Sequence, residues 1–152
     1  MSPSRAPDLS PPSRWRAEIR RLRPEARVAA PATEESLAGS ARALGQPLPA
    51  PLRDLLRECD GVQDEDGTDV VWDAARIAAD NASFRACPDF AALCMPFTPL
   101  LLFGDDGGGD RFAFVRQPQR DEDVFVWEHE SDSRRWVAPG LDAYLRRVLG
   151  GG

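Results

Sequence analysis

A β-hairpin is predicted over residues 98–116, Thr98-Pro99-Leu100-Leu101-Leu102-Phe103-Gly104-Asp105-Asp106-Gly107-Gly108-Gly109-Asp110-Arg111-Phe112-Ala113-Phe114-Val115-Arg116. The run from Thr98 to Phe103 is continuously apolar, which is typical of a strand that is covered on both faces. Residues 104–110 are rich in glycine and aspartate and predict a tight turn. Residues 111–116 then return as the second strand of the hairpin.

Two more strands and a closing helix are predicted after the hairpin. Residues 123–128 and 135–137 favour strands, and a short β-like segment at 69–72 precedes the hairpin. The last helix opens at Pro139. Its apolar stripe consists of Leu141, Tyr144, Leu145, Val148 and Leu149.

Three helices are predicted before the hairpin. The first closes at or just before Pro24, and the second has Thr33 as its N-cap and Gly45 as its C′ residue. Pro51 fits position N1 of the third helix, which stops at Gly61. The buried faces of these helices are expected to be Trp15, Ile19 and Leu22; Leu37, Ala41 and Leu44; and Leu52, Leu55, Leu56 and Cys59.

Helices first, then a strand meander, then a closing helix predict an α+β fold. We expect N-terminal helices packed on a mainly antiparallel sheet of about four to five strands, with a C-terminal helix. A single domain is expected over residues 14–149. The proline-rich residues 1–13 predict a flexible N-terminal tail, and residues 150–152 a disordered tail. All four tryptophans are expected in the core.

The composition excludes several classes of function. The net charge of −6 disfavours nucleic acid and anionic membrane as partners, and all 19 basic residues are arginine, which removes lysine chemistry. Residues 90–104 form the longest uncharged segment, too short for the ~20 residues of a membrane span. The N-terminus lacks the apolar run of a signal peptide, and the odd number of cysteines fits reduced thiols, so a cytoplasmic location is expected.

No motif for a cofactor or a metal ion is complete. The spacing from Gly104 to Gly109 resembles a phosphate loop, but Asp110-Arg111 stands in place of the Lys-Ser/Thr pair. His129 is the only histidine, so His129-Glu130 does not begin a zinc motif. We therefore predict no cofactor, no metal and no enzymatic activity. His129 is expected to be hydrogen-bonded at a strand end, although a hydrolase built on it with a nearby acid or cysteine is an alternative.

Acidic residues are concentrated in the second part of the chain. Residues 1–57 hold ten arginines against six acids, whereas residues 58–152 hold nine against nineteen. Solvent-exposed loops are the ordinary explanation for this concentration of acids. An acidic face could also dock a basic protein by electrostatic steering. The candidate partner-binding residues are Asp64, Glu65, Asp66, Asp105, Asp106, Asp110, Asp121, Asp123, His129 and Glu130.

Several segments, taken in order, resemble the SUKH superfamily, which includes the yeast cell-wall regulators of the Smi/Knr type. The resemblance covers roughly residues 14–149, with a longer, more proline-rich first third than usual and a single glycine, Gly61, after the third helix. The matching segments are Leu44-Gly45-Gln46-Pro47-Leu48-Pro49, Cys59-Asp60-Gly61, Leu102-Phe103-Gly104 through Gly109-Asp110-Arg111-Phe112-Ala113-Phe114, Asp123 through Trp127-Glu128-His129-Glu130, and Val137-Ala138-Pro139 with the helix after it.

The resemblance implies a non-enzymatic α+β binding module. Bacterial members are commonly immunity proteins that bind and occlude a cognate toxin domain, and the arginine-only composition looks actinobacterial. The expected partner is therefore a cognate protein, such as a basic, nuclease-like toxin domain. A regulatory or scaffold protein of the Smi/Knr type, or a small-ligand sensor with a pocket near His129, is the alternative.

Overall fold

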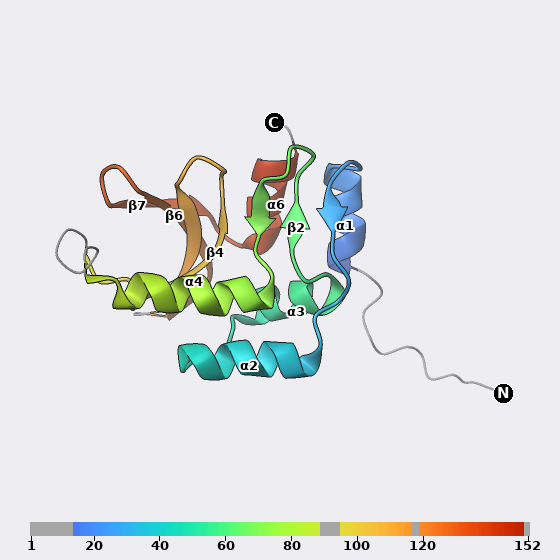
Figure 1. Cartoon of the computed structure of the whole chain (residues 1–152). Coiled ribbons are helices and arrows are strands. Elements are labelled where there is room, and N and C mark those ends of the chain that lie inside the picture. Colours follow the sequence, from blue (N-terminus) through green and yellow to red (C-terminus); the bar gives the residue numbers. More distant parts are fainter. Residues whose placement is uncertain (1–13, 89–94, 117–118, 151–152) are drawn as a thin grey trace.

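The computed structural model describes residues 14–88, 95–116 and 119–150, and it confirms the α+β class (Figure 1). The predicted tails at 1–13 and 151–152 lie outside these residues, while Gly150 ends the last helix with its N–H donated to Arg146 O. The elements are α1 (Arg14–Leu22), β1 (Arg27–Val28), α2 (Glu34–Leu44), α3 (Ala50–Glu58), β2 (Val62–Gln63), β3 (Asp69–Val71), α4 (Ala74–Ala86), β4 (Leu100–Asp105), β5 (Arg111–Arg116), β6 (Gln119–Glu128), β7 (Ser133–Ala138) and α6 (Leu141–Leu149).

The described strands form two antiparallel sheets. One has the order β1-β2-β3 and the other the order β4-β5-β6-β7. The predicted hairpin is confirmed, with Leu100 opposite Val115 and Asp105 opposite Arg111. Strand β4 therefore runs to Asp105, into the segment that was predicted as a turn. The strands thus form two sheets where a single sheet was expected. The three-stranded sheet was not predicted because β1 and β2 are only two residues long and have no pattern that sequence alone could detect.

The predicted caps of α2 and the predicted proline at the start of α3 are confirmed, but α3 ends at Glu58, before the predicted stop at Gly61, because Cys59 already adopts an extended conformation. Thr33 Oγ1 accepts a hydrogen bond from the Ser36 N–H at 2.9 Å. Gly45 follows α2 with φ +70°, the left-handed conformation that glycine adopts without strain. Pro51 lies in the first turn of α3, where its missing N–H costs nothing. Helix α6 begins at Leu141, two residues later than the predicted opening at Pro139.

Helix α4 was not predicted. Its apolar face has small residues and a buried polar one, Asn81, so the helical period is weak in the sequence. The Asn81 amide donates to Leu102 O and accepts from Leu102 N, both at 2.8 Å. Since β4 is an edge strand, Asn81 supplies the partners that a neighbouring strand would otherwise give to Leu102.

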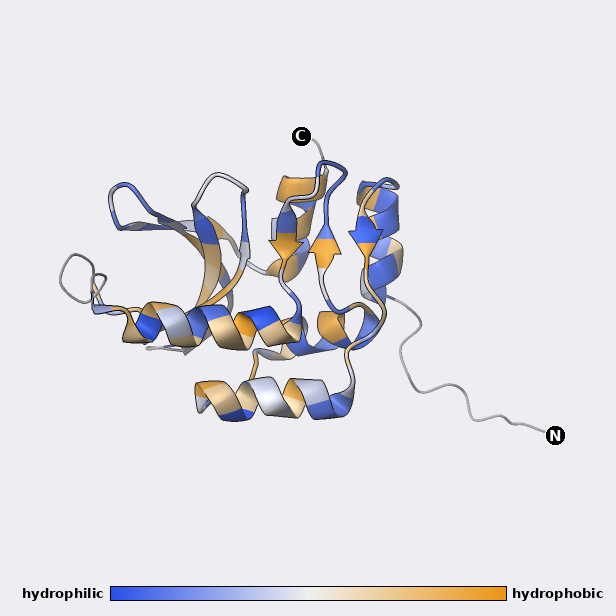
Figure 2. Cartoon of the chain, viewed as in Figure 1, coloured by the Kyte–Doolittle hydropathy of each residue, from blue (hydrophilic) through white to orange (hydrophobic). Residues whose placement is uncertain are grey.

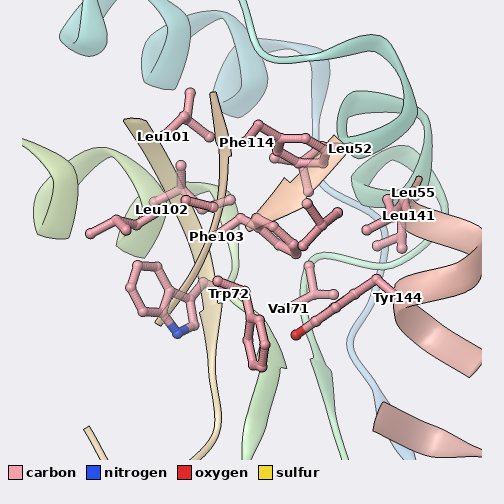
Figure 3. Close-up of a cluster of buried hydrophobic side chains, with 14 of the residues drawn as sticks. Leu52, Leu55, Val71, Trp72, Leu101, Leu102, Phe103, Phe114, Leu141 and Tyr144 are labelled. Carbon is pink, nitrogen blue, oxygen red and sulfur yellow. The ribbon is translucent and has the colours of Figure 1, made fainter. Parts of the chain in front are cut away.

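The two sheets meet in the core at Phe103. The centroid of the Phe103 ring lies 4.7 Å from that of Phe114 and 5.1 Å from that of Tyr144 (Figure 3). The Phe103 carbonyl accepts a hydrogen bond from the Trp72 N–H at 2.7 Å. The Tyr144 hydroxyl, from α6, donates to Val70 O of β3 at 2.6 Å. One cluster thus joins both sheets to the C-terminal helix.

Gly104 has no space for a side chain. A Cβ at Gly104 would lie 2.1 Å from Val70 O and 3.2 Å from the Tyr144 hydroxyl. The backbone of β4 therefore approaches β3 more closely than any other residue type would allow.

The prediction that all four tryptophans are buried is wrong for Trp136. Trp15, Trp72 and Trp127 lie in the core, but Trp136 on strand β7 is 53% exposed. Strand β7 is an edge strand, and a register shift pairs Trp136 with the half-buried Phe125, whereas Ala138 pairs with the buried Val124.

Gly104→Ala is expected to lower the free energy of unfolding by about 1–3 kcal/mol or more, because the new methyl would overpack the core against a backbone carbonyl. Denaturant unfolding followed by tryptophan fluorescence measures the change. Gly39→Ala is the matched control, since its nearest neighbour is Arg42 Nη2 at 3.9 Å; inside α2 it should stabilise by about 0.5–1 kcal/mol. Equal stability of Gly104→Ala and the wild-type protein would contradict the close approach.

Asn81→Leu is expected to destabilise the fold by about 1–3 kcal/mol, because it leaves the buried N–H and C=O of Leu102 without partners. The measurement is denaturant unfolding, with amide hydrogen exchange at Leu102 as a local readout. Ser83→Ala, on the exposed side of α4, serves as control and should stay within about 0.5 kcal/mol of the wild type. Unchanged protection of the Leu102 amide would contradict the role of Asn81.

Candidate functional site

Three loops lie side by side along one edge of the molecule, at the top of Figure 1. They are the β2–β3 loop (64–68), the β4–β5 loop (106–110) and the β6–β7 loop (129–132). A Cβ at Gly107 would lie 3.2 Å from Thr68 Oγ1, and one at Gly109 would lie 2.8 Å from the His129 ring. Glycines at these two positions therefore let the middle loop contact both neighbours.

This arrangement brings together eight of the ten predicted partner-binding residues, and we call the surface the acidic loop edge. The β2–β3 and β6–β7 loops are hydrophilic in Figure 2. The acidic loop edge consists of Asp64, Glu65, Asp66, Asp105, Asp106, Asp110, His129 and Glu130.

Asp121 and Asp123 do not belong to this edge. Both lie on β6 toward its start, while His129 follows its other end. The Asp121 side chain lies outside the described part of the structure. Asp123 Oδ1 accepts from Trp136 Nε1 at 3.4 Å, on the β7 side of the sheet. Asp123 therefore lies apart from the acidic loop edge, and partner binding by Asp121 and Asp123 stays a prediction.

The β2–β3 loop is held by its own carboxylates. Asp64 Oδ1 accepts from the N–H groups of Asp66 and Thr68, and Asp66 Oδ1 accepts from Thr68 Oγ1 at 2.8 Å. Burial raises the pKa of Asp64, whereas hydrogen bonds from Asp64 and Thr68 lower the pKa of Asp66. Glu65 pairs with Arg23 at 3.0 Å, which ties the loop to the end of α1. The loop is thus rigid and keeps the charge of Asp66 exposed.

Asp105 is a structural acid at the end of β4. Its Oδ2 accepts from Trp72 Nε1 at 2.8 Å and from Arg76 Nη2 at 3.3 Å. Arg76 also lies over the Trp72 ring, 4.2 Å from its centroid. Asp106, the next residue, accepts only from the Gly108 N–H among the described residues and is exposed. The hairpin turn therefore offers one free carboxylate, at Asp106.

His129 is hydrogen-bonded at the end of β6, as the sequence indicated. Its Nδ1 lies 2.6 Å from Asp110 Oδ1, which also accepts from the His129 N–H at 3.0 Å. The hydrogen bond from the His129 ring holds the pKa of Asp110 below its usual value. This pair connects the β4–β5 loop to the β6–β7 loop.

An acidic groove of about 310 Å³ lies beside the acidic loop edge, on the sheet β1-β2-β3. Its lining includes Asp60, Asp69 and Asp73, which belong to the same acidic run as Asp64 but were not predicted as site residues. Asp60 accepts from Ala74 N and Asp73 from Arg76 N, so both carboxylates sit at the start of α4. Burial raises the pKa of Asp60. Asp73 could have been found as the N-cap of the alanine-rich segment after it, whereas no local pattern in the sequence indicates Asp60.

The described residues around His129 do not form an activated nucleophile or a metal cluster. Among the described residues, no hydroxyl or thiol is hydrogen-bonded to His129. Burial raises the pKa of Cys59 to about 11, the opposite of an activated nucleophile. In the described part of the chain, no group of three His, Cys, Asp or Glu side chains could hold a metal ion. None of the described helices is long and apolar enough to cross a membrane.

His129→Ala is expected to raise the pKa of Asp110 toward the ordinary aspartate value of about 3.9. Because the native pKa is lowered, the stabilisation from this pair is present above the ordinary value and is lost as the pH falls through the lowered one. Carboxyl ¹³C NMR titration of Asp110 measures the change. Glu130→Gln, the neighbouring loop residue, is the control and should leave the titration in place. An unchanged Asp110 titration in His129→Ala would contradict the coupling.

The comparison with known families agrees with this architecture. The model of the SMI1 / KNR4 family (SUKH-1) matches residues 31–147, from the segment before α2 to within α6. No curated protein matches the sequence. The matched range covers the hairpin, all three loops of the acidic loop edge and the acidic groove, apart from the groove residues on β1 and just after it. The chain belongs to the SMI1 / KNR4 family (SUKH-1).

Proposed function

We propose that this protein is a non-catalytic protein-binding module of the immunity type. In this proposal the acidic loop edge and the acidic groove cover a basic surface around the active site of a cognate toxin domain. Occlusion requires no chemistry from the immunity protein, which accords with the absence of a nucleophile bonded to His129 among the described residues. The observation that carries the proposal is the contact of the middle loop with both of its neighbours at Gly107 and Gly109.

The charges on this surface favour a basic partner. Asp66, Asp106 and Glu130 are exposed, one on each of the three loops. No arginine is paired with any of these three among the described residues. Carboxylates of like charge on one edge create a negative field of the kind that surrounds a polyanion, so a nuclease-like domain that binds phosphates is the partner class that this surface fits.

The loops are fixed before a partner arrives. Asp64 accepts a hydrogen bond from the Thr68 N–H, and Asp105 accepts one from the Gly107 N–H. Together with the pair between His129 and Asp110, these bonds determine the loop conformations. A fixed surface loses little conformational entropy on binding, which raises affinity. The same feature would also suit a regulatory or scaffold protein of the Smi/Knr type, which is the second candidate.

Small-ligand sensing has less support. It would require an enclosed, mostly apolar pocket with convergent polar groups near His129. The acidic groove is lined by three carboxylates on a short sheet, and His129 is not among its residues. The other two described grooves lie on the helices.

The decisive experiment is co-expression with a toxin-like domain encoded beside this protein. We expect survival of the cells and a stable complex, whose association rate falls steeply with salt. The variant Asp66→Asn/Asp106→Asn/Glu130→Gln should slow association on the order of 10-fold at low salt, because electrostatic steering is lost.

The matched control neutralises three acids away from the acidic loop edge, on α2, α3 and α6: Glu35→Gln/Asp54→Asn/Asp142→Asn. It changes the net charge by the same amount and should leave the association rate near that of the wild type. A salt-independent complex, or equal effects of the two triple variants, would contradict an acidic docking surface. A toxin that kills despite this protein would exclude the immunity role for that pair and favour the regulatory candidate.

A further inference from the structure

A second groove lies between α2 and α3, at the opposite end of the molecule from the acidic loop edge (Figure 1). Its volume is about 210 Å³, and its apolar lining includes Leu37, Ala41 and Leu48. Sites for small molecules usually measure about 300–1,000 Å³. A groove of this size is better matched to one aliphatic side chain of a protein partner, which is how anchor residues occupy interfaces.

The charged rim of this α2–α3 groove is formed by Arg53, Arg57 and Glu34. Arg57 is satisfied, because its Nε and Nη2 both donate to Glu34 at 2.9 Å. The Arg53 guanidinium has no acceptor among the described residues, and its Nε is shielded from solvent. Arginine keeps its charge at every physiological pH. Arg53 therefore carries a charge that helps to lower the pKa of Glu34, while its guanidinium donates no hydrogen bond to an acceptor among the described residues.

The charged side chains that line the groove have a net positive charge, because Arg53 and Arg57 stand against the single acid Glu34. An apolar groove with an unpaired guanidinium at its rim is complementary to a side chain pair of one aliphatic residue and one carboxylate. An arginine fork binds a carboxylate with two parallel hydrogen bonds, which adds geometric selectivity to the charge.

We propose that the α2–α3 groove docks an acidic amphipathic segment of a partner protein, with an aliphatic residue in the groove and a neighbouring Asp or Glu on Arg53. Helical spacing of three or four residues would place the two side chains on one face of such a segment. This inference does not rest on the proposed function, because the groove and the acidic loop edge share no residue and carry opposite charge.

The test uses short blocked alanine-rich peptides in which one Leu and one Glu stand three or four positions apart. Binding to the full-length ¹⁵N-labelled protein is followed by NMR. We expect amide shifts confined to α2, α3 and the segment between them. Replacing the peptide Glu by Gln should weaken binding on the order of 10-fold or more, as expected for a hydrogen bond between charged groups.

Two variants of the protein probe the two halves of the site. Arg53→Gln should weaken binding of the Glu peptide to the level of the Gln peptide. Ala38→Trp should fill the groove and abolish binding of both peptides. Arg42→Gln is the control, because Arg42 is an exposed arginine of α2 that does not line the groove. Amide spectra of the free variants verify that each is folded.

Several results would overturn the proposal. They are equal binding of the Glu and Gln peptides, equal binding by Arg53→Gln and the wild type, shifts located outside α2 and α3, or no shifts at millimolar peptide. If peptides bind only after removal of residues 1–12, the chain's own N-terminal segment is the occupant, and the proposal of a partner segment is wrong. Binding of a basic, toxin-like domain to the acidic loop edge is an independent readout, and none of these variants should change it.

Discussion

The carbonyl of Val70 accepts the Tyr144 hydroxyl at 2.6 Å and lies against the backbone of Gly104. This contact joins strand β3, the central hairpin and the C-terminal helix, which lie far apart in the sequence. Burying a hydroxyl and a carbonyl is costly unless they are hydrogen-bonded, so this bond and the buried leucines of α6 together fix the position of the helix. Any side chain at residue 104 would separate the two sheets at this point, and β3 and β4 could no longer lie together.

The geometry of the acidic loop edge depends on that junction. The β2–β3 loop belongs to one sheet and the other two loops to the second sheet. They contact one another only because β3 approaches β4, which lets Gly107 reach Thr68 and Gly109 receive the His129 ring. The surface is therefore a product of core packing, and its acids are positioned in part by the buried contact of Val70, Gly104 and Tyr144.

Local signals in the sequence predicted the local structure well. The hairpin, the Thr33 cap and the Gly45 terminus each depend on neighbours within a few residues, and all are confirmed. Helix α4 and the short sheet depend on distant partners instead: Asn81 is explained only by the edge of β4, and β1 and β2 only by each other. Trp136 was expected in the core because its residue type packs well there, but exposure is decided by which neighbour covers the strand. For the site, charge density along the chain identified most of the acidic loop edge, yet it could not separate Asp123 from it or add Asp60.

Most of the acids in the acidic loop edge stabilise the loops themselves, so the effect of replacing one of them is not an effect on recognition alone. Asp64, Asp105 and Asp110 accept hydrogen bonds that shape the loops, so replacing them changes the surface as well as its charge. Their charges still contribute to the field that a distant partner experiences, because a hydrogen bond does not cancel a net charge. Glu65 differs, since Arg23 neutralises it at 3.0 Å. In the proposed complex, the long-range attraction is therefore spread over more residues than those that contact the partner, and selectivity at close range depends on the exposed carboxylates of Asp66, Asp106 and Glu130.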